Sequence, residues 1–199
     1  MIKLIVTLIM ALLSTFTNAQ LRGSGKTITK TYYYNNFDKL SFQDLDGKIE
    51  VEIGKEFSIS VIIDDNLFPI LGFEENNSKN ELKLFFKNNA NNKKYIENTN
   101  IKIMISMPKI LELNHSGNSN LIVSNLSGTN FKLKNSGNGI IKISGSIDLL
   151  EIINTGNGNT KAEKLFSKNA KIIIFKFDNE NDFLVFSSYR AAITQSETT

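Results

Sequence analysis

Hydrophobic and polar residues alternate along most of the chain after residue 36. The clearest run is residues 48–53, where isoleucine or valine alternates with lysine or glutamate. A period of two is typical of half-buried β-strands, and shorter runs of the same kind occupy residues 57–63, 82–86 and 101–105. Asparagine- and glycine-containing turns separate them. Only residues 66–71 suit a helical turn, which Pro69 keeps short, so the pattern predicts an all-β chain.

The C-terminal half contains a repeat of 19–20 residues. Apolar residues recur at fixed places in each unit, and each of the first three units carries one Gly-Asn corner. The corners are Gly117 and Asn118, Gly137 and Asn138, and Gly156 and Asn157. Repeats of this length indicate stacked supersecondary units. We therefore predict a β-solenoid with one coil per unit, rather than hairpins with asparagine-rich turns, because the flanking apolar positions repeat as well.

A row of charged residues alternates in sign from unit to unit. Its members are Glu112, Lys132, Glu151 and Lys171. In stacked parallel strands about 4.8 Å apart, equivalent residues lie side by side, where opposite charges favour the register. The same stacking would align the corner asparagines, so that their amides bond along the stack. The glycine before each asparagine permits a tight corner.

The first residues have the features of an export signal. Lys3 precedes an apolar run over residues 4–13, and Ala19 ends a small-x-small cleavage pattern. We interpret residues 1–19 as a signal peptide, because the run is shorter than the roughly 20 residues that cross a bilayer; a retained anchor is the alternative. The sequence then predicts an exported chain, in the periplasm, on the outer surface or outside the cell, with no further membrane span.

With these residues in view, the chain resembles the GIN domain family of putative auto-transporter adhesin heads. The resemblance rests on residues 37–40, on Val51-Glu52-Ile53-Gly54, on Met107-Pro108 and on the repeated Ser-Gly-Asn corners, and covers about residues 23–174. It implies a right-handed β-helix-like solenoid in exported bacterial proteins. From the alternation before the repeat we expect residues 37–107 to extend this stack with less regular N-terminal coils. The resemblance implies no functional residues.

The pattern changes near residue 175. We divide the chain into a signal peptide (1–19), an N-terminal segment (20–36), a GIN-like β-solenoid domain (37–174) and an atypical C-terminal tail (175–199). The tail is either a cap or the product of a changed reading frame. Ile153, Ile173, Phe175 and Phe177 share outward parity, and this apolar stripe favours the second interpretation. The stripe also needs a cover or a partner.

Composition narrows the chemistry. The net charge of +3 and the absence of cysteine argue against a nucleic-acid binder, a thiolate metal site and a thiol nucleophile. The single histidine, His115, is a poor metal ligand alone and is interpreted as a turn residue replacing asparagine. Paired carboxylates such as Asp64 and Asp65 are interpreted as solvated turns, and the outer lysines as solubilising charge. We expect no catalytic residue, metal or cofactor.

Three functions fit these features. The first is a non-enzymatic binding or adhesin-like module at the cell envelope, with an envelope protein or a glycan as partner. The second is a carbohydrate-active β-helix enzyme, which needs an acidic cluster in one groove. The third is a scaffold in which copies of the chain assemble end to end. Tyr32, Tyr33 and Tyr34 either cover the first strands or stack on sugar rings.

Overall fold

The computed structural model describes residues 21–87, 96–97, 99–177 and 183–191. The expected signal peptide lies outside these residues. Within them the chain forms strands and one 3-10 helix, η1 (Phe68–Ile70), inside the expected segment 66–71, with no α-helix and no helix able to cross a membrane. The all-β prediction is confirmed. The strands are β1 (Leu21–Arg22), β2 (Thr27–Tyr32), β3 (Lys39–Leu45), β4 (Lys48–Ile53), β5 (Ser58–Asp64), β6 (Leu71–Asn76), β7 (Glu81–Phe86), β8 (Ile96–Glu97), β9 (Lys102–Met107), β10 (Glu112–Gly117), β11 (Asn120–Asn135), β12 (Ile141–Asn154), β13 (Thr160–Phe177) and β14 (Phe183–Ala191).

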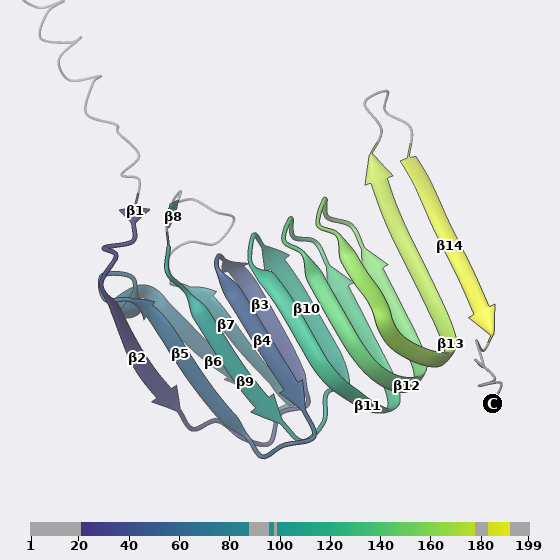
Figure 1. Cartoon of the computed structure of the whole chain (residues 1–199), viewed down its shortest axis with the longest axis horizontal. Coiled ribbons are helices and arrows are strands. Elements are labelled where there is room, and N and C mark those ends of the chain that lie inside the picture. Colours follow the sequence, from purple (N-terminus) through teal and green to yellow (C-terminus); the bar gives the residue numbers. More distant parts are fainter. Residues whose placement is uncertain (1–20, 88–95, 98, 178–182, 192–199) are drawn as a thin grey trace, which may run out of the picture.

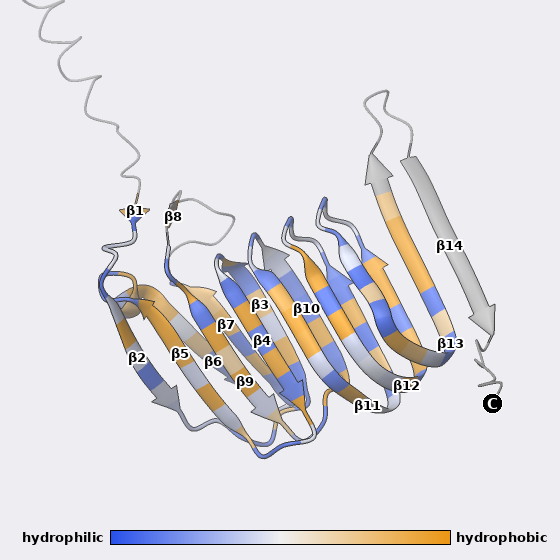
Figure 2. Ribbon diagram, viewed as in Figure 1, coloured by the Kyte–Doolittle hydropathy of each residue, from blue (hydrophilic) through white to orange (hydrophobic). Residues whose placement is uncertain are grey.

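Alternation decides which face of each strand is buried. In β4, Ile49, Val51 and Ile53 are at most 2% exposed, while the charged residues between them point outward. β-branched side chains suit such a half-buried pleated surface. Figure 2 shows the same alternation along most strands. The sheet therefore has one apolar face and one polar face.

Apart from the short β1–β8 pair, the strands form one sheet that curls so that two arms oppose each other (Figure 1). The long strands β11, β12 and β13 bend, and the two halves of β11 pair with different neighbours, β4 and β10. From β11 the first arm continues through β4, β9 and β5 to β2, and the second arm through β10, β3 and β7 to β6. The buried apolar residues of both arms form one core.

The C-terminal repeats lie side by side in parallel. Leu113 lies opposite Leu133, Leu133 opposite Ile152, and Ile152 opposite Ile172. The first three of these side chains are at most 3% exposed. Recurring apolar positions of the repeat thus become neighbours on the inner face.

The N-terminal strands do not follow chain order. Strands β3 and β4 pair with β10 and β11, whereas β7 and β9 pair with the far sides of β3 and β4. The stacking order is therefore β7 and β9, then β3 and β4, then β10 and the first part of β11. Strands β2, β5 and β6 add antiparallel pairs. Sequence analysis expected irregular coils here but not this order, because alternation identifies a strand and not its partner.

Candidate functional site

A buried row of polar side chains crosses the C-terminal repeats. His115, Asn135 and Asn154 lie at equivalent positions of β10, β11 and β12 and are at most 7% exposed. His115 Nδ1 lies 2.8 Å from Asn135 Oδ1, and Asn135 Nδ2 donates to Asn154 Oδ1 at 2.9 Å. His115 Nε2 lies 2.9 Å from Ser119 Oγ. The histidine replaces an asparagine, as expected, but it lies in a strand and not in a turn.

Two backbone groups fix the direction of these hydrogen bonds. The Gly137 N–H donates to Asn135 Oδ1 at 3.0 Å, and Asn154 Nδ2 donates to the Gly158 carbonyl at 3.1 Å. Since Asn135 Oδ1 is an acceptor, His115 Nδ1 carries its proton and Nε2 accepts from the serine hydroxyl. Burial lowers the pKa of His115, against the opposing effect of the hydrogen bond that its ring donates to Asn135. Both ring nitrogens of the neutral imidazole thus make hydrogen bonds inside the protein, as is typical of a histidine with a structural role.

The glycines of the Gly-Asn corners stack without room for side chains. A Cβ at Gly137 would stand 2.8 Å from His115 Cε1 and would meet the Gly117 carbonyl, and a Cβ at Gly156 would meet the Gly137 carbonyl. Gly117 also has φ +115, in the region that favours glycine. On the surface, Asn138 Nδ2 donates to Asn118 Oδ1 at 3.0 Å. This bond joins the first two of the three corner asparagines.

A row of alternating charge runs along the outer face of the second arm. In register order it contains Glu81, Lys39, Glu112, Lys132, Glu151 and Lys171. Lys132 Nζ lies 2.6 Å from Glu151 Oε2, and Lys171 Nζ 3.4 Å from Glu151 Oε1. Glu112 instead pairs with Lys134 at 2.6 Å. The row is longer than the four residues that the repeat identifies, because β3 and β7 add a residue each.

The apolar stripe expected from the sequence lies on the outer face of the second arm, beside the row of alternating charge. Ile153 and Ile173 are opposite each other and half-buried, and Phe175 is also half-buried. The Phe177 side chain is not among the side chains that the structure describes. At the backbone level, β14 pairs antiparallel with the end of β13.

Two of the three tyrosines near the N-terminus pack against the protein. The ring centroids of Tyr32 and Tyr34 lie 4.2 and 5.3 Å from that of Phe73. Tyr33 is 92% exposed. These contacts cover the edge of the sheet and leave a single ring for other uses.

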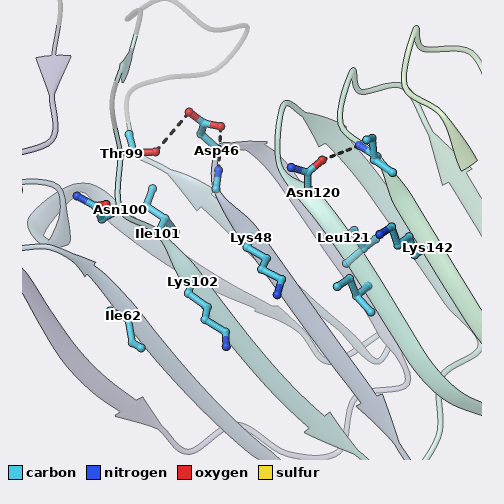
Figure 3. Close-up of a pocket in the computed structure, with 13 residues that line it drawn as sticks. Asp46, Lys48, Ile62, Thr99, Asn100, Ile101, Lys102, Asn120, Leu121 and Lys142 are labelled. Carbon is cyan, nitrogen blue, oxygen red and sulfur yellow. Dashed lines mark hydrogen bonds between the residues drawn. The ribbon is translucent and has the colours of Figure 1, made fainter.

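An open hollow of about 760 Å³ lies on the outer face of the first arm (Figure 3). It forms where β4, β9, β11 and β12 begin, because parallel strands bring their amino ends to one edge of the sheet. Lys48 lies opposite both Lys102 and Asn120, and Lys142 enters from β12. Ile62 of β5 supplies part of the apolar floor.

Two aspartates accept hydrogen bonds from the loops at the rim of this hollow. Asp46 Oδ1 accepts from the Gly47 N–H at 2.8 Å, and its Oδ2 accepts from the Thr99 hydroxyl at 3.3 Å. Asp64 does not lie in a solvated turn as expected: it ends β5, is fully buried, and accepts from the Asn100 N–H at 2.6 Å and from the Gly25 N–H at 2.9 Å. Both carboxylates therefore serve loop structure and are not available as a catalytic pair.

The electrostatics of the hollow are dominated by lysines. Lys48 Nζ and Lys102 Nζ lie 2.6 and 3.1 Å from the two oxygens of Glu50. The hydrogen bond from Lys48 is the main cause that lowers the pKa of Glu50, with Lys102 adding to it against a smaller effect of burial. One ionised carboxylate is thus shared by two ammonium groups. Lys142 is exposed and makes no ion pair with the described residues.

A second hollow, of about 340 Å³, continues from the first. The two share Ile122 and Lys142, and the second adds Lys161 and Glu163 from β13. Lys142 lies directly opposite Lys161. We call Lys102, Lys48, Lys142 and Lys161 the lysine track.

Sequence analysis missed the lysine track. It interpreted the outer lysines as solubilising charge, and the pairing of β4 with β9 cannot be recognised from a repeat that begins after both. It also missed a second stack of glycines, in which a Cβ at Gly139 would meet the Ser119 carbonyl and a Cβ at Gly158 the Gly139 carbonyl. The signal for this stack was present, because each of these residues follows its corner glycine by two positions.

The acidic side chains and the histidine of the described residues do not form one cluster. Among the described residues, no three His, Asp or Glu side chains gather as a metal site would require. His115 is bonded to Asn135 and Ser119, with no acidic partner in contact. Glu74, which with Glu75 forms a second pair of adjacent carboxylates, lies beside Lys83 on the second arm.

Comparison with known proteins gives the following matches. A family model described as "Putative auto-transporter adhesin, head GIN domain" matches residues 36–194. A putative adhesin from Bacteroides fragilis is 20% identical with a TM-score of 0.60, over 76% of this chain and 78% of that chain. A putative adhesin from Parabacteroides merdae is 18% identical with a TM-score of 0.50, over 77% and 79% of the two chains. No curated protein matches the chain significantly. At these identities the solved structures establish a shared fold.

Proposed function

The chain belongs to the family of putative auto-transporter adhesin head GIN domains, and we propose that it is an exported, non-enzymatic binding module of the cell envelope. The family and the two solved structures from Bacteroides fragilis and Parabacteroides merdae are named as putative adhesins. The observation that carries the proposal is the pair of joined hollows on the outer face of the first arm. They present ammonium groups and an apolar floor, which is the usual composition of a ligand site.

The proposed function also concerns the architecture of the repeats. We propose that the parallel repeats are coils of an open right-handed solenoid, whose long side faces serve as binding surfaces. Stacked repeats commonly present extended surfaces of this kind. The alternating charges of Glu112, Lys132, Glu151 and Lys171 would then act as register residues, and the glycine corners as tight bends.

Export is proposed from the first 19 residues. Their charge, apolar run and small-residue ending suit a secretory signal. Cell fractionation with an antibody against the protein tests this directly. Recovery of full-length, uncleaved protein from the cytosol would contradict it.

An end-to-end assembly is the second proposal, and a specific observation favours it. Ile172 and Ile174 point to the inner face of β13, yet both are only half-buried, whereas Ile152 one strand earlier is 3% exposed. A hollow of about 580 Å³ opens there. Size-exclusion chromatography with light scattering separates the two proposals, because a monomer across the micromolar range would refute assembly.

The binding function is tested by a glycan array and by immobilised envelope fractions, each probed with the purified protein. We expect retention on at least one glycan class. Absence of binding to every glycan and to intact envelope fractions would refute the proposed function. Release of a sugar product from a retained glycan would instead favour the enzyme alternative.

A further inference from the structure

We infer that the lysine track binds an extended acidic polysaccharide, laid across strands β9, β4, β11, β12 and β13. This inference rests on the proposed binding function and names the ligand class for its site. The ligand is a carbohydrate chain that carries carboxylate or sulfate groups.

Like charges face each other along the track. Lys48 lies directly opposite Lys102, and Lys142 directly opposite Lys161. Like charges at directly opposed positions of neighbouring strands destabilise a sheet. The second arm of the same sheet avoids this cost, since Lys132 lies between Glu112 and Glu151. Local rules that are obeyed on one face and broken on another commonly mark a functional surface.

The lysines of the track are available to a ligand. Within the described part of the chain, Lys142 and Lys161 form no ion pair, and Lys48 and Lys102 share the single carboxylate of Glu50. Lys48 and Lys102 keep side-chain exposures of 50% and 40%. An incoming anion therefore meets ammonium groups that are only partly neutralised.

The dimensions favour a chain and not a single anion. Neighbouring strands are about 4.8 Å apart, so the four steps from β9 to β13 extend over about 19 Å. The two hollows adjoin at Ile122 and Lys142, and together their linings extend from β9 to β13. A ligand with repeated negative charges would contact successive lysines along this line.

Neutral contacts complement the charges. Asn120 Oδ1 accepts from the Ile140 N–H at 2.9 Å. The oxygen of this amide is therefore occupied, and its NH₂ group can donate to a ligand. Ile62 and Ile122 line the floor, and Ile140 is 41% exposed at the rim. Sugar hydroxyls and the apolar faces of sugar rings match this mixture of donors and aliphatic groups.

A lipid surface fits less well. Leu149 and Phe166, the two large aliphatic or phenyl side chains with the greatest exposure on the described residues, are 52% and 59% exposed. They lie in the middle of β12 and β13, beyond the part of these strands that lines the hollows, where Ile140 is the one large apolar side chain with comparable exposure. The track itself is hollowed and charged. An acidic polymer is therefore the ligand that the arrangement favours over anionic headgroups.

The test measures binding of the purified protein to polygalacturonate, to dextran sulfate and to neutral dextran at low salt. The informative variant is Lys48→Gln with Lys142→Gln. The control is Lys134→Gln with Lys168→Gln, which removes the same charge elsewhere. Lys134 matches Lys48 closely, because its side chain is 48% exposed and it has an ion pair of the same length, 2.6 Å.

We expect the polyanions to bind and neutral dextran to be ignored, with weaker binding at higher salt because ions screen exposed charges. The track variant should bind about tenfold more weakly, if each ammonium contributes about two- to fivefold. The control should stay within about twofold of the original protein, and circular dichroism should show both variants folded.

Three results would overturn the inference. The first is equal weakening in the track and control variants, which would indicate net charge alone. The second is binding to vesicles of phosphatidylglycerol with none to either polyanion. The third is retention on neutral glycans that the track variant leaves unchanged; this last result would refute the inference while leaving the proposed binding function intact.

Discussion

Replacing Asn135 by alanine should destabilise the fold strongly. The substitution removes the acceptor of the His115 Nδ1–H and of the Gly137 N–H, and the donor to Asn154 Oδ1. Each buried group left unpaired costs about 1–3 kcal/mol. The three groups belong to one row, so their costs are not additive. We therefore expect a loss of about 3–5 kcal/mol in the free energy of unfolding, a large part of the total of a typical domain.

Urea unfolding followed by far-ultraviolet circular dichroism measures this loss, with the midpoint compared at an unchanged slope. The matched control is Asn138→Ala, because Asn138 is an exposed asparagine of the same repeat with one surface bond to Asn118. Its cost should be below about 0.5 kcal/mol. Equal effects of the two substitutions, or a loss below about 1 kcal/mol for Asn135→Ala, would refute the structural role of the row.

Three further predictions concern the same repeats. In the unfolded chain the His115 imidazole has a pKa of about 6.5, whereas burial lowers this pKa in the folded state. The free energy of unfolding should therefore fall as the pH drops below about 6.5 and level off below the folded-state pKa. Urea unfolding at a series of pH values measures this, and the His115→Asn variant should show a flatter dependence over the same range. Gly137→Ala should cost more than about 2 kcal/mol, because its Cβ meets backbone and the buried ring, and a melting temperature unchanged from the parent would contradict this. Glu151→Lys places a third ammonium between Lys132 and Lys171; its melting temperature should rise with added salt more than that of the parent, since salt screens repulsion, and equal salt responses would count against the charged row.

The strands and their inner faces could be predicted from the sequence. Alternation in residues 48–53 indicates both the strand and its buried side, because the side-chain period of a strand is two. The repeat also indicates which residues become neighbours, as in the set Leu113, Leu133, Ile152 and Ile172. Both inferences depend on local pattern or on a period that the chain itself displays.

The arrangement of the N-terminal strands could not be predicted in the same way. Strand β4 lies between β9 and β11, although both of these strands are far from β4 in the sequence and share no repeat with it. The pairing depends on loop closure and on the fit of the whole core. The lysine track follows from this pairing, since Lys48 and Lys102 become neighbours only when β4 and β9 do.

The buried polar row of His115, Asn135 and Asn154 could be predicted only in part from the sequence. The alignment of His115 with Asn135 and Asn154 follows from the repeat, but alternation in a turn-rich stretch does not say that these positions are inside. Their burial depends on the corner glycines, which allow the chain to close tightly over them. The sequence therefore indicated the stack and not its polar interior.

Amide chemical-shift mapping with polygalacturonate tests the central claim most directly, because it locates the ligand on the folded protein. The account predicts shifts concentrated at the starts of β4, β9, β11, β12 and β13, around Lys48, Lys102, Lys142 and Lys161. Shifts centred on the outer face of the second arm, around Lys132 and Lys134, would contradict it.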